Sequence, residues 1–156
     1  MNQQLLERLL IGDKEAIDIF GESDNCAVID WHAGVPEIVE TVASFLPLDY
    51  MKLEQTSPTS FLLHAGGRFS QPIELSSHTR QESLISLVNA LLAPDFELRQ
   101  FKPCDGDPHS LYVAATDVWK KVEHLHPLAV EKFFLSAPRL AVYWQRGYHS
   151  RLFSRP

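Results

Sequence analysis

The sequence predicts a single α+β domain with helices packed on a largely antiparallel sheet of about five or six strands. Three observations support this fold class. Helical patterns, with apolar residues three and four apart, are gathered between runs of short period-two patterns typical of strands. The strand patterns of residues 50–75 are separated only by turns, which favours antiparallel hairpins over parallel crossovers. No segment repeats, and 156 residues are enough for one domain.

We expect residues 1–138 to form this domain, beginning with a helical pair. Residues 139–156 are expected to add a C-terminal strand and a basic, aromatic tail packed on the same domain. There is no apolar run of membrane-spanning length and no secretory signal, so a cytoplasmic location is expected. Cys26 and Cys104 are then expected to be two thiols, and a disulfide between them is the alternative.

The first fifty residues predict three helices and one strand. Residues 2–11 and 13–20 have amphipathic helical patterns, and Asp13 is a suitable N-cap for the second. Residues 26–31 form a nearly continuous apolar run, which suits an interior strand. Pro36 and the apolar spacing after it predict a helix that runs to about residue 45.

The middle of the chain predicts antiparallel strands and then the most strongly marked helix. Residues 50–54, 61–64 and 69–75 have strand patterns, although Pro72 makes the last one an edge or irregular strand. A capping box at Thr79 and Glu82 begins the helix, and Pro94 ends it. Its apolar face is formed by Leu84, Ile85, Leu87, Val88, Leu91 and Leu92.

The last third predicts strands and helices in turn. Residues 96–99 alternate as a half-buried strand would, with Glu97 and Arg99 facing solvent. A loop over 102–109 precedes a strand over 110–114 and a helix over 116–122. Pro127 opens a helix that includes Phe134 and is broken at Pro138, and residues 140–144 have strand character.

The charge of the chain is unevenly distributed. The net charge is −6, but residues 139–156 contain four arginines and no acidic residue, so residues 1–138 carry −10. Contacts with phosphates require Lys and Arg, so nucleic acid is an unfavourable partner for this acidic body. An acidic surface either steers a basic partner or keeps the protein in solution.

A candidate polar site combines the end of the first predicted strand with the 102–109 loop. A carboxylate can orient a neighbouring imidazole as a base, and thiolate, carboxylate and imidazole groups are all metal ligands. The spacing matches no standard zinc pattern, so turn formation by the loop and by Asp30 is the competing interpretation. The candidate residues are Asp30, His32, Cys104, Asp105, Asp107 and His109.

Two other patterns have structural interpretations. His124 and His126 would share a face on a strand and chelate a metal, but Pro127 favours a connection between helices. Gly66-Gly67-Arg68 lacks the phosphate-loop pattern and predicts a hairpin turn.

The C-terminal tail has the composition of a recognition surface, because Trp, Tyr and Arg commonly anchor interfaces. Packing of its aromatic residues onto the core and stacking on single-stranded nucleic acid are the alternatives. The candidate partner-binding residues are Tyr143, Trp144, Arg146, Tyr148, Arg151 and Arg155.

The relevant stretches are residues 72–80 (PIELSSHTR) continuing through the helix to residues 91–99 (LLAPDFELR), and the Ile29-Asp-Trp31 strand with the acidic helix after it, about a third of the chain together. They resemble small, acidic, single-domain bacterial proteins, either immunity proteins encoded beside toxins or uncharacterised relatives of this type. The resemblance is structural and implies a protein partner, not a catalytic residue.

We therefore expect a non-enzymatic protein-binding module, of the type of an immunity inhibitor that masks a toxin domain, with no cofactor or metal. One alternative is a small metal-dependent or His/Asp hydrolase that uses the polar site. The other is a structural subunit of a homo-oligomer, such as a homodimer.

Overall fold

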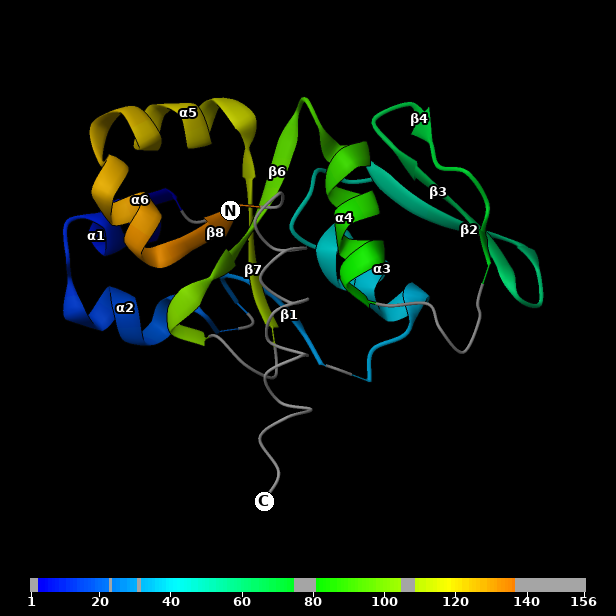
Figure 1. Cartoon of the computed structure of the whole chain (residues 1–156), viewed down its shortest axis with the longest axis horizontal. Coiled ribbons are helices and arrows are strands. Elements are labelled where there is room, and N and C mark those ends of the chain that lie inside the picture. The colour runs from blue at the N-terminus through cyan, green and yellow to red at the C-terminus, as the bar shows by residue number, and fades with distance from the viewer. Residues whose placement is uncertain (1–2, 23, 31, 75–80, 105–108, 137–156) are drawn as a thin grey trace, which may run out of the picture.

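The computed structural model describes residues 3–22, 24–30, 32–74, 81–104 and 109–136 (Figure 1). The helices in this part of the chain are α1 (Gln3–Leu10), α2 (Lys14–Phe20), α3 (Val35–Ala43), α4 (Gln81–Leu92), α5 (Thr116–Leu125) and α6 (Pro127–Phe133), with a 3₁₀ turn, η1, at Lys102–Cys104. The strands are β1 (Ala27–Ile29), β2 (Met51–Ser57), β3 (Ser60–Ala65), β4 (Arg68–Phe69), β5 (Ile73–Glu74), β6 (Phe96–Phe101), β7 (His109–Ala115) and β8 (Phe134–Ser136).

These strands form two four-stranded sheets. Sheet A has the order β1-β7-β6-β8. In sheet B, β3 pairs with β2, β4 and β5. Every pairing described is antiparallel, so the predicted α+β class is confirmed. The strands are divided between two sheets, where the sequence suggested one.

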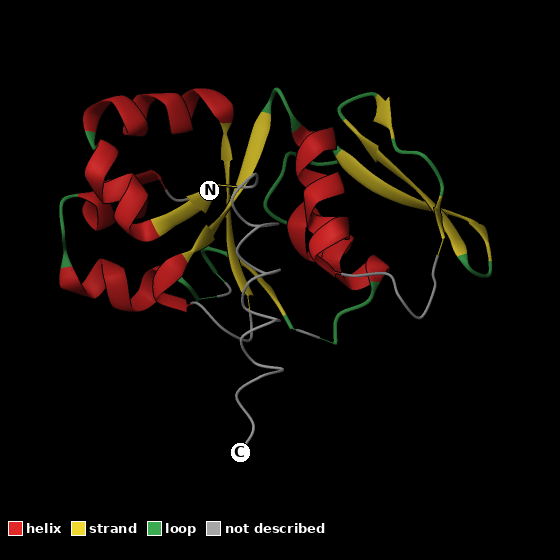
Figure 2. Ribbon diagram, in the orientation of Figure 1, coloured by secondary structure: helices red, strands yellow, loops and turns green. Residues whose placement is uncertain are grey.

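The two sheets and six helices form four layers (Figures 1 and 2). Helices α1, α2, α5 and α6 cover one face of sheet A, while α3 and α4 lie between its other face and sheet B. Each face of sheet A therefore has its own hydrophobic core. The first core joins sheet A, α3, α4 and sheet B, and the second joins sheet A to the other four helices.

Local signals explain where the helices begin and end. The Asp13 carboxylate accepts the N–H of Ala16 at 3.2 Å, as expected for the N-cap of α2. Helix α4 ends at Leu92, just before Pro94, as predicted. Its buried side chains include Leu84, Ile85, Val88 and Leu92, and each contributes roughly 1.5–3 kcal/mol before entropy is subtracted. The predicted capping box lies outside the described residues and side chains.

The prediction for β6 is wrong, because sheet A is covered on both faces. Arg99 and Gln100 are 6% and 1% exposed, so β6 is a buried central strand and not a half-buried one. Asn89 of α4 contributes to its anchoring, because its side-chain oxygen accepts the N–H of Leu98 at 2.7 Å. β8 pairs with β6 only at the three residues after Leu98, Arg99 to Phe101.

Two further predictions need correction. The segment at Phe134 is not the end of a helix but the start of β8, because Phe134 pairs with Phe101 across the sheet. β1 is buried as predicted, but it lies at the end of the described order of sheet A and not in its interior. A strand with helices over both faces is buried even at an edge.

The Cys26 thiol is buried, and its S–H donates to the carbonyl of Phe20 at 3.2 Å. The longest helix described, α4, has 12 residues, and none of the described helices combines the length and apolarity needed to cross a membrane.

Candidate functional site

The structure brings together the two segments that the sequence assigned to a polar site. β1 pairs with β7 so that Ile29 lies opposite His109, the first residue of β7. Asp30 therefore follows β1 at the same end of sheet A as His109. The side chain of Cys104, together with Asp105 and Asp107, lies outside the described part of the chain.

Asp30 acts as a turn cap at this end of the sheet. Its carboxylate accepts the N–H of His32 at 2.8 Å, and its carbonyl accepts the N–H of Ala33 at 2.9 Å. The side-chain amide of Gln81, at the start of α4, donates to the carbonyls of Asp30 and Ala33 at 2.9 and 3.0 Å. The structural interpretation of Asp30 is thus confirmed, and Gln81 is a contributor that the sequence did not indicate.

The same carboxylate also approaches an imidazole. Asp30 Oδ1 lies 3.4 Å from His32 Nδ1, and the two side chains are 59% and 69% exposed. A carboxylate beside an imidazole is the arrangement that orients a general base. Here both groups are well hydrated, and the carboxylate already serves the turn.

Gln100 is a buried member of this end of sheet A that sequence reasoning missed. Its side-chain nitrogen lies 3.5 Å from Nδ1 of His109, at the limit of hydrogen bonding. Its Oε1 is buried and has no hydrogen-bond partner within the described structure. Leu98, Leu111 and Leu135 belong to the core on this face of the sheet. A glutamine in a strand pattern gives no signal that it will face a core.

Metal binding by described residues has no geometric support. Among residues 3–136, excluding the gaps in the description, no group of three or more His, Cys, Asp or Glu side chains could hold an ion. His124 lies near the end of α5, and His126 connects α5 to α6, as the helix-connection interpretation predicted.

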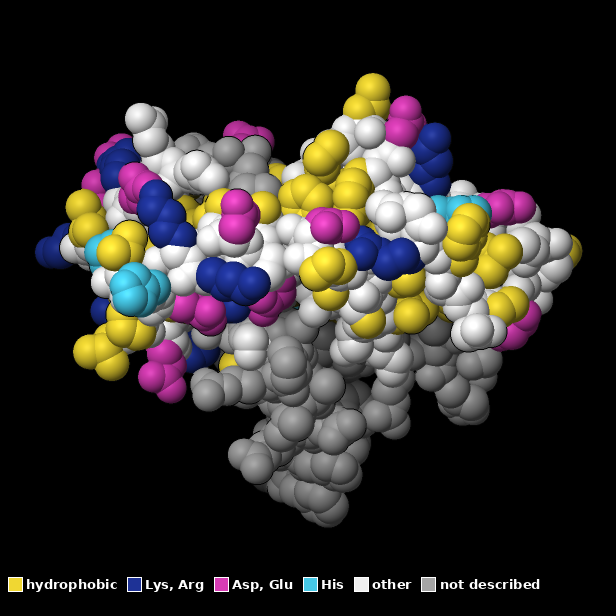
Figure 3. All heavy atoms as spheres, turned by 90° about the horizontal axis from the view of Figure 1, so that it is seen from above, with side chains coloured by type: hydrophobic (Ala, Val, Ile, Leu, Met, Phe, Trp, Pro, Cys, Tyr) yellow, Lys and Arg dark blue, Asp and Glu magenta, His cyan; other side chains and the backbone are white. Residues whose placement is uncertain are grey.

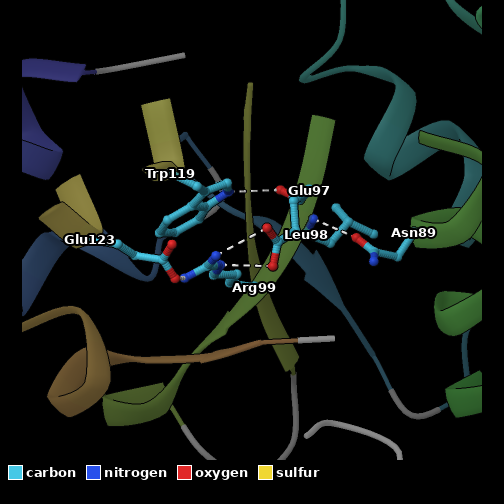
Figure 4. Close-up of polar contacts among 6 residues, drawn as sticks. All are labelled: Asn89, Glu97, Leu98, Arg99, Trp119 and Glu123. Atoms are coloured by element: carbon cyan, nitrogen blue, oxygen red, sulfur yellow. Dashed lines mark hydrogen bonds and ion pairs between the residues drawn. The ribbon is translucent and has the colours of Figure 1, made fainter. Parts of the chain in front are cut away.

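A charged cluster around the buried Arg99 side chain lies on the other face of β6 (Figure 4). Arg99 donates to both carboxylate oxygens of Glu97, at 2.9 and 3.0 Å, and to Glu123 at 2.6 Å. Its guanidinium carbon lies 4.2 Å from the centroid of the Trp119 ring. The Trp119 indole N–H donates to the carbonyl of Glu97 at 3.1 Å. This cluster holds α5 against sheet A.

The pKa of Arg99 reflects two opposing effects, the burial of its charge and its interactions with the two carboxylates. Burial alone would lower that pKa, but the hydrogen bonds and charges of Glu97 and Glu123 outweigh burial and raise it. The guanidinium therefore stays charged, and the cluster has a structural role.

A second polar network ties sheet B to the turn between α4 and β6. Arg68 donates to the Tyr50 hydroxyl at 2.9 Å and to Asp95 Oδ2 at 2.8 Å, and Tyr50 donates to the same carboxylate oxygen at 2.7 Å. Hydrogen bonds from Tyr50 and Arg68 lower the pKa of Asp95. Burial, followed by the bond to Asp95, raises the pKa of Tyr50. We call these three residues the Tyr50 clasp.

The Gly66-Gly67 turn leaves room for the Tyr50 clasp. Gly66 and Gly67 have φ values of +54° and +78°, in the left-handed region that favours glycine. A Cβ atom on Gly66 would lie 2.6 Å from the Tyr50 hydroxyl. The predicted hairpin turn is therefore confirmed, and Gly66 is required for both its conformation and its close approach to Tyr50.

The negative charge is concentrated in the first fifty residues. They contain ten acidic and two basic residues, a formal charge of −8. Exposed acidic side chains lie on α2, on the segment after it and on α3, two helices that pack on opposite faces of sheet A. We refer to these six residues collectively as the acidic surface: Glu15, Asp18, Glu22, Asp24, Glu37 and Glu40. Within the described residues only Glu15 of this set forms an ion pair, with Arg8. By contrast, the face in Figure 3 carries both charges interspersed.

The six tail residues with interface character, Tyr143 to Arg155, lie outside the described residues.

No family model, curated protein or solved structure matches this chain.

Proposed function

We propose that this chain is a protein-binding module that places its acidic surface over a basic site of a partner, as an immunity-type inhibitor masks a toxin domain. The observation that carries the proposal is the charge of −8 on residues 1–50. Complementary charge speeds encounter and fixes the register of two proteins. The nature of the partner as a toxin comes from the sequence resemblance alone.

The exposure of the acidic side chains and the lack of ion-pair partners, within the described residues, for all of them but Glu15 support this role. Asp18 and Glu22 project from α2 and the turn after it, and Glu37 and Glu40 from α3. Ion pairs within the described residues use none of these four side chains, so their charges remain available to a partner. The helices that carry them are anchored by buried apolar faces, which keeps the spacing of the charges fixed.

The first experiment compares two variants with the same net charge. One neutralises the acidic surface with Asp18→Asn, Glu22→Gln, Glu37→Gln and Glu40→Gln. The matched control raises the net charge equally at exposed positions elsewhere, with Gln55→Lys, Thr59→Lys, Ser83→Lys and Ala90→Lys. The wild type and both variants are each used to capture binding proteins from an extract of the protein's native host.

We expect the wild type and the control to retain a basic partner that the neutralised variant loses. Added salt should weaken that retention, because exposed charges are screened. Equal capture of the same proteins by the neutralised variant and the wild type would contradict the role of the acidic surface. Circular dichroism checks that both variants are folded.

The immunity role is tested separately. Each neighbouring gene product is expressed alone and together with this chain. Wild-type protein should protect cells from a toxic product, and the neutralised variant should protect them less. If cells lacking the chain resist every neighbouring product, the immunity role is wrong even where a protein partner exists.

A second candidate, a small metal-dependent or His/Asp hydrolase, is favoured by the register that brings Asp30 and His109 to one end of sheet A. Zinc titration by calorimetry compares the wild type with His109→Ala and with His124→Ala as a control distant in sequence. Binding lost only in His109→Ala would support this candidate. Absence of zinc binding, together with unchanged hydrolysis of model esters in His32→Ala, would remove it.

A further inference from the structure

We draw no further inference here: the strongest candidate, the contact between buried Gln100 and half-buried His109 at the end of sheet A, belongs to the polar site already described, and the Gln100 amide oxygen that lacks a partner within the described residues is sealed from solvent, so no ligand can reach it.

Discussion

Arg99 and Gln100 are consecutive residues of β6 that face opposite cores and satisfy their polar groups to different degrees. The Arg99 guanidinium has two carboxylate partners and an indole ring against it. The Gln100 amide has one long contact, to His109, and a buried oxygen without a partner in the described structure. A buried polar group stabilises a fold only when its hydrogen bonds are made. The two residues should therefore respond differently to the same substitution.

Gln100→Met is expected to raise the free energy of unfolding by about 1 kcal/mol, because it removes an unsatisfied buried acceptor and keeps a similar volume. Urea denaturation at neutral pH measures the change. Gln55→Met, at an exposed position of β2, is the control and should have little effect. A loss of stability in Gln100→Met would show that the contact with His109 outweighs the unmade bond.

Arg99→Met is expected to lower the free energy of unfolding by about 3 kcal/mol, because Glu97 and Glu123 lose their shared cation. This is near the lower end for breaking a buried pair, since the Glu123 side chain is 47% exposed and can be hydrated. Adding Glu97→Gln and Glu123→Gln to Arg99→Met should recover part of the loss. If the triple variant is no more stable than Arg99→Met, uncompensated charge is not the cause.

At the scale of elements, the sequence predicts those whose local signals agree. Helix α2 has a capping Asp13, and α4 has a wide apolar face ending before Pro94. The Glu97 and Arg99 positions of β6 look solvent-facing because their burial depends on α5, more than fifteen residues later. Likewise, Phe134 continues a helical pattern, and only its pairing with Phe101 makes it a strand residue. Long-range pairing leaves no local signal.

The Tyr50 clasp predicts how the attachment of sheet B responds to acid. The pKa of Asp95 is lowered in the folded state, so ionised Asp95 stabilises the fold above its unfolded pKa of about 3.9. That contribution is lost as pH falls from this value through the lower folded-state pKa. Asp95→Asn should thus lower the thermal midpoint at neutral pH, and the difference from the wild type should shrink in acid.

Thermal denaturation of the wild type and of Asp95→Asn, repeated from about pH 7 to about pH 2, measures the difference between their thermal midpoints at each pH. Asp18→Asn, which removes the same charge from an exposed site outside every described ion pair, is the matched control. A constant difference between Asp95→Asn and the wild type down to the lowest pH would contradict the role of the charged clasp.

At the scale of the whole molecule, the candidate site is only partly predictable from sequence. The sequence indicates Asp30 and His109 as candidate polar residues beside strands. Their placement at one end of sheet A depends on the register of β1 with β7, two strands about eighty positions apart in the chain. Gln100 enters the same site through a third strand. The acidic excess of residues 1–50, by contrast, can be counted directly.

The two cores share sheet A, so the molecule is expected to unfold in one cooperative transition.

Phe20 is fully buried in the second core, against the rings of Phe101, Tyr112 and Phe134. Phe20→Leu should cost about 1–2 kcal/mol, between a volume-conserving exchange and a truncation to Ala. Because sheet A joins the two cores, this loss lowers the free energy of unfolding of the whole molecule. Hydrogen exchange at the Leu63 amide of sheet B should therefore accelerate by the factor that corresponds to the lost free energy. Leu63→Val, in the first core, should reciprocally reduce protection at Tyr112. If Phe20→Leu leaves the Leu63 amide unchanged, sheet B opens independently and the shared-sheet argument is wrong.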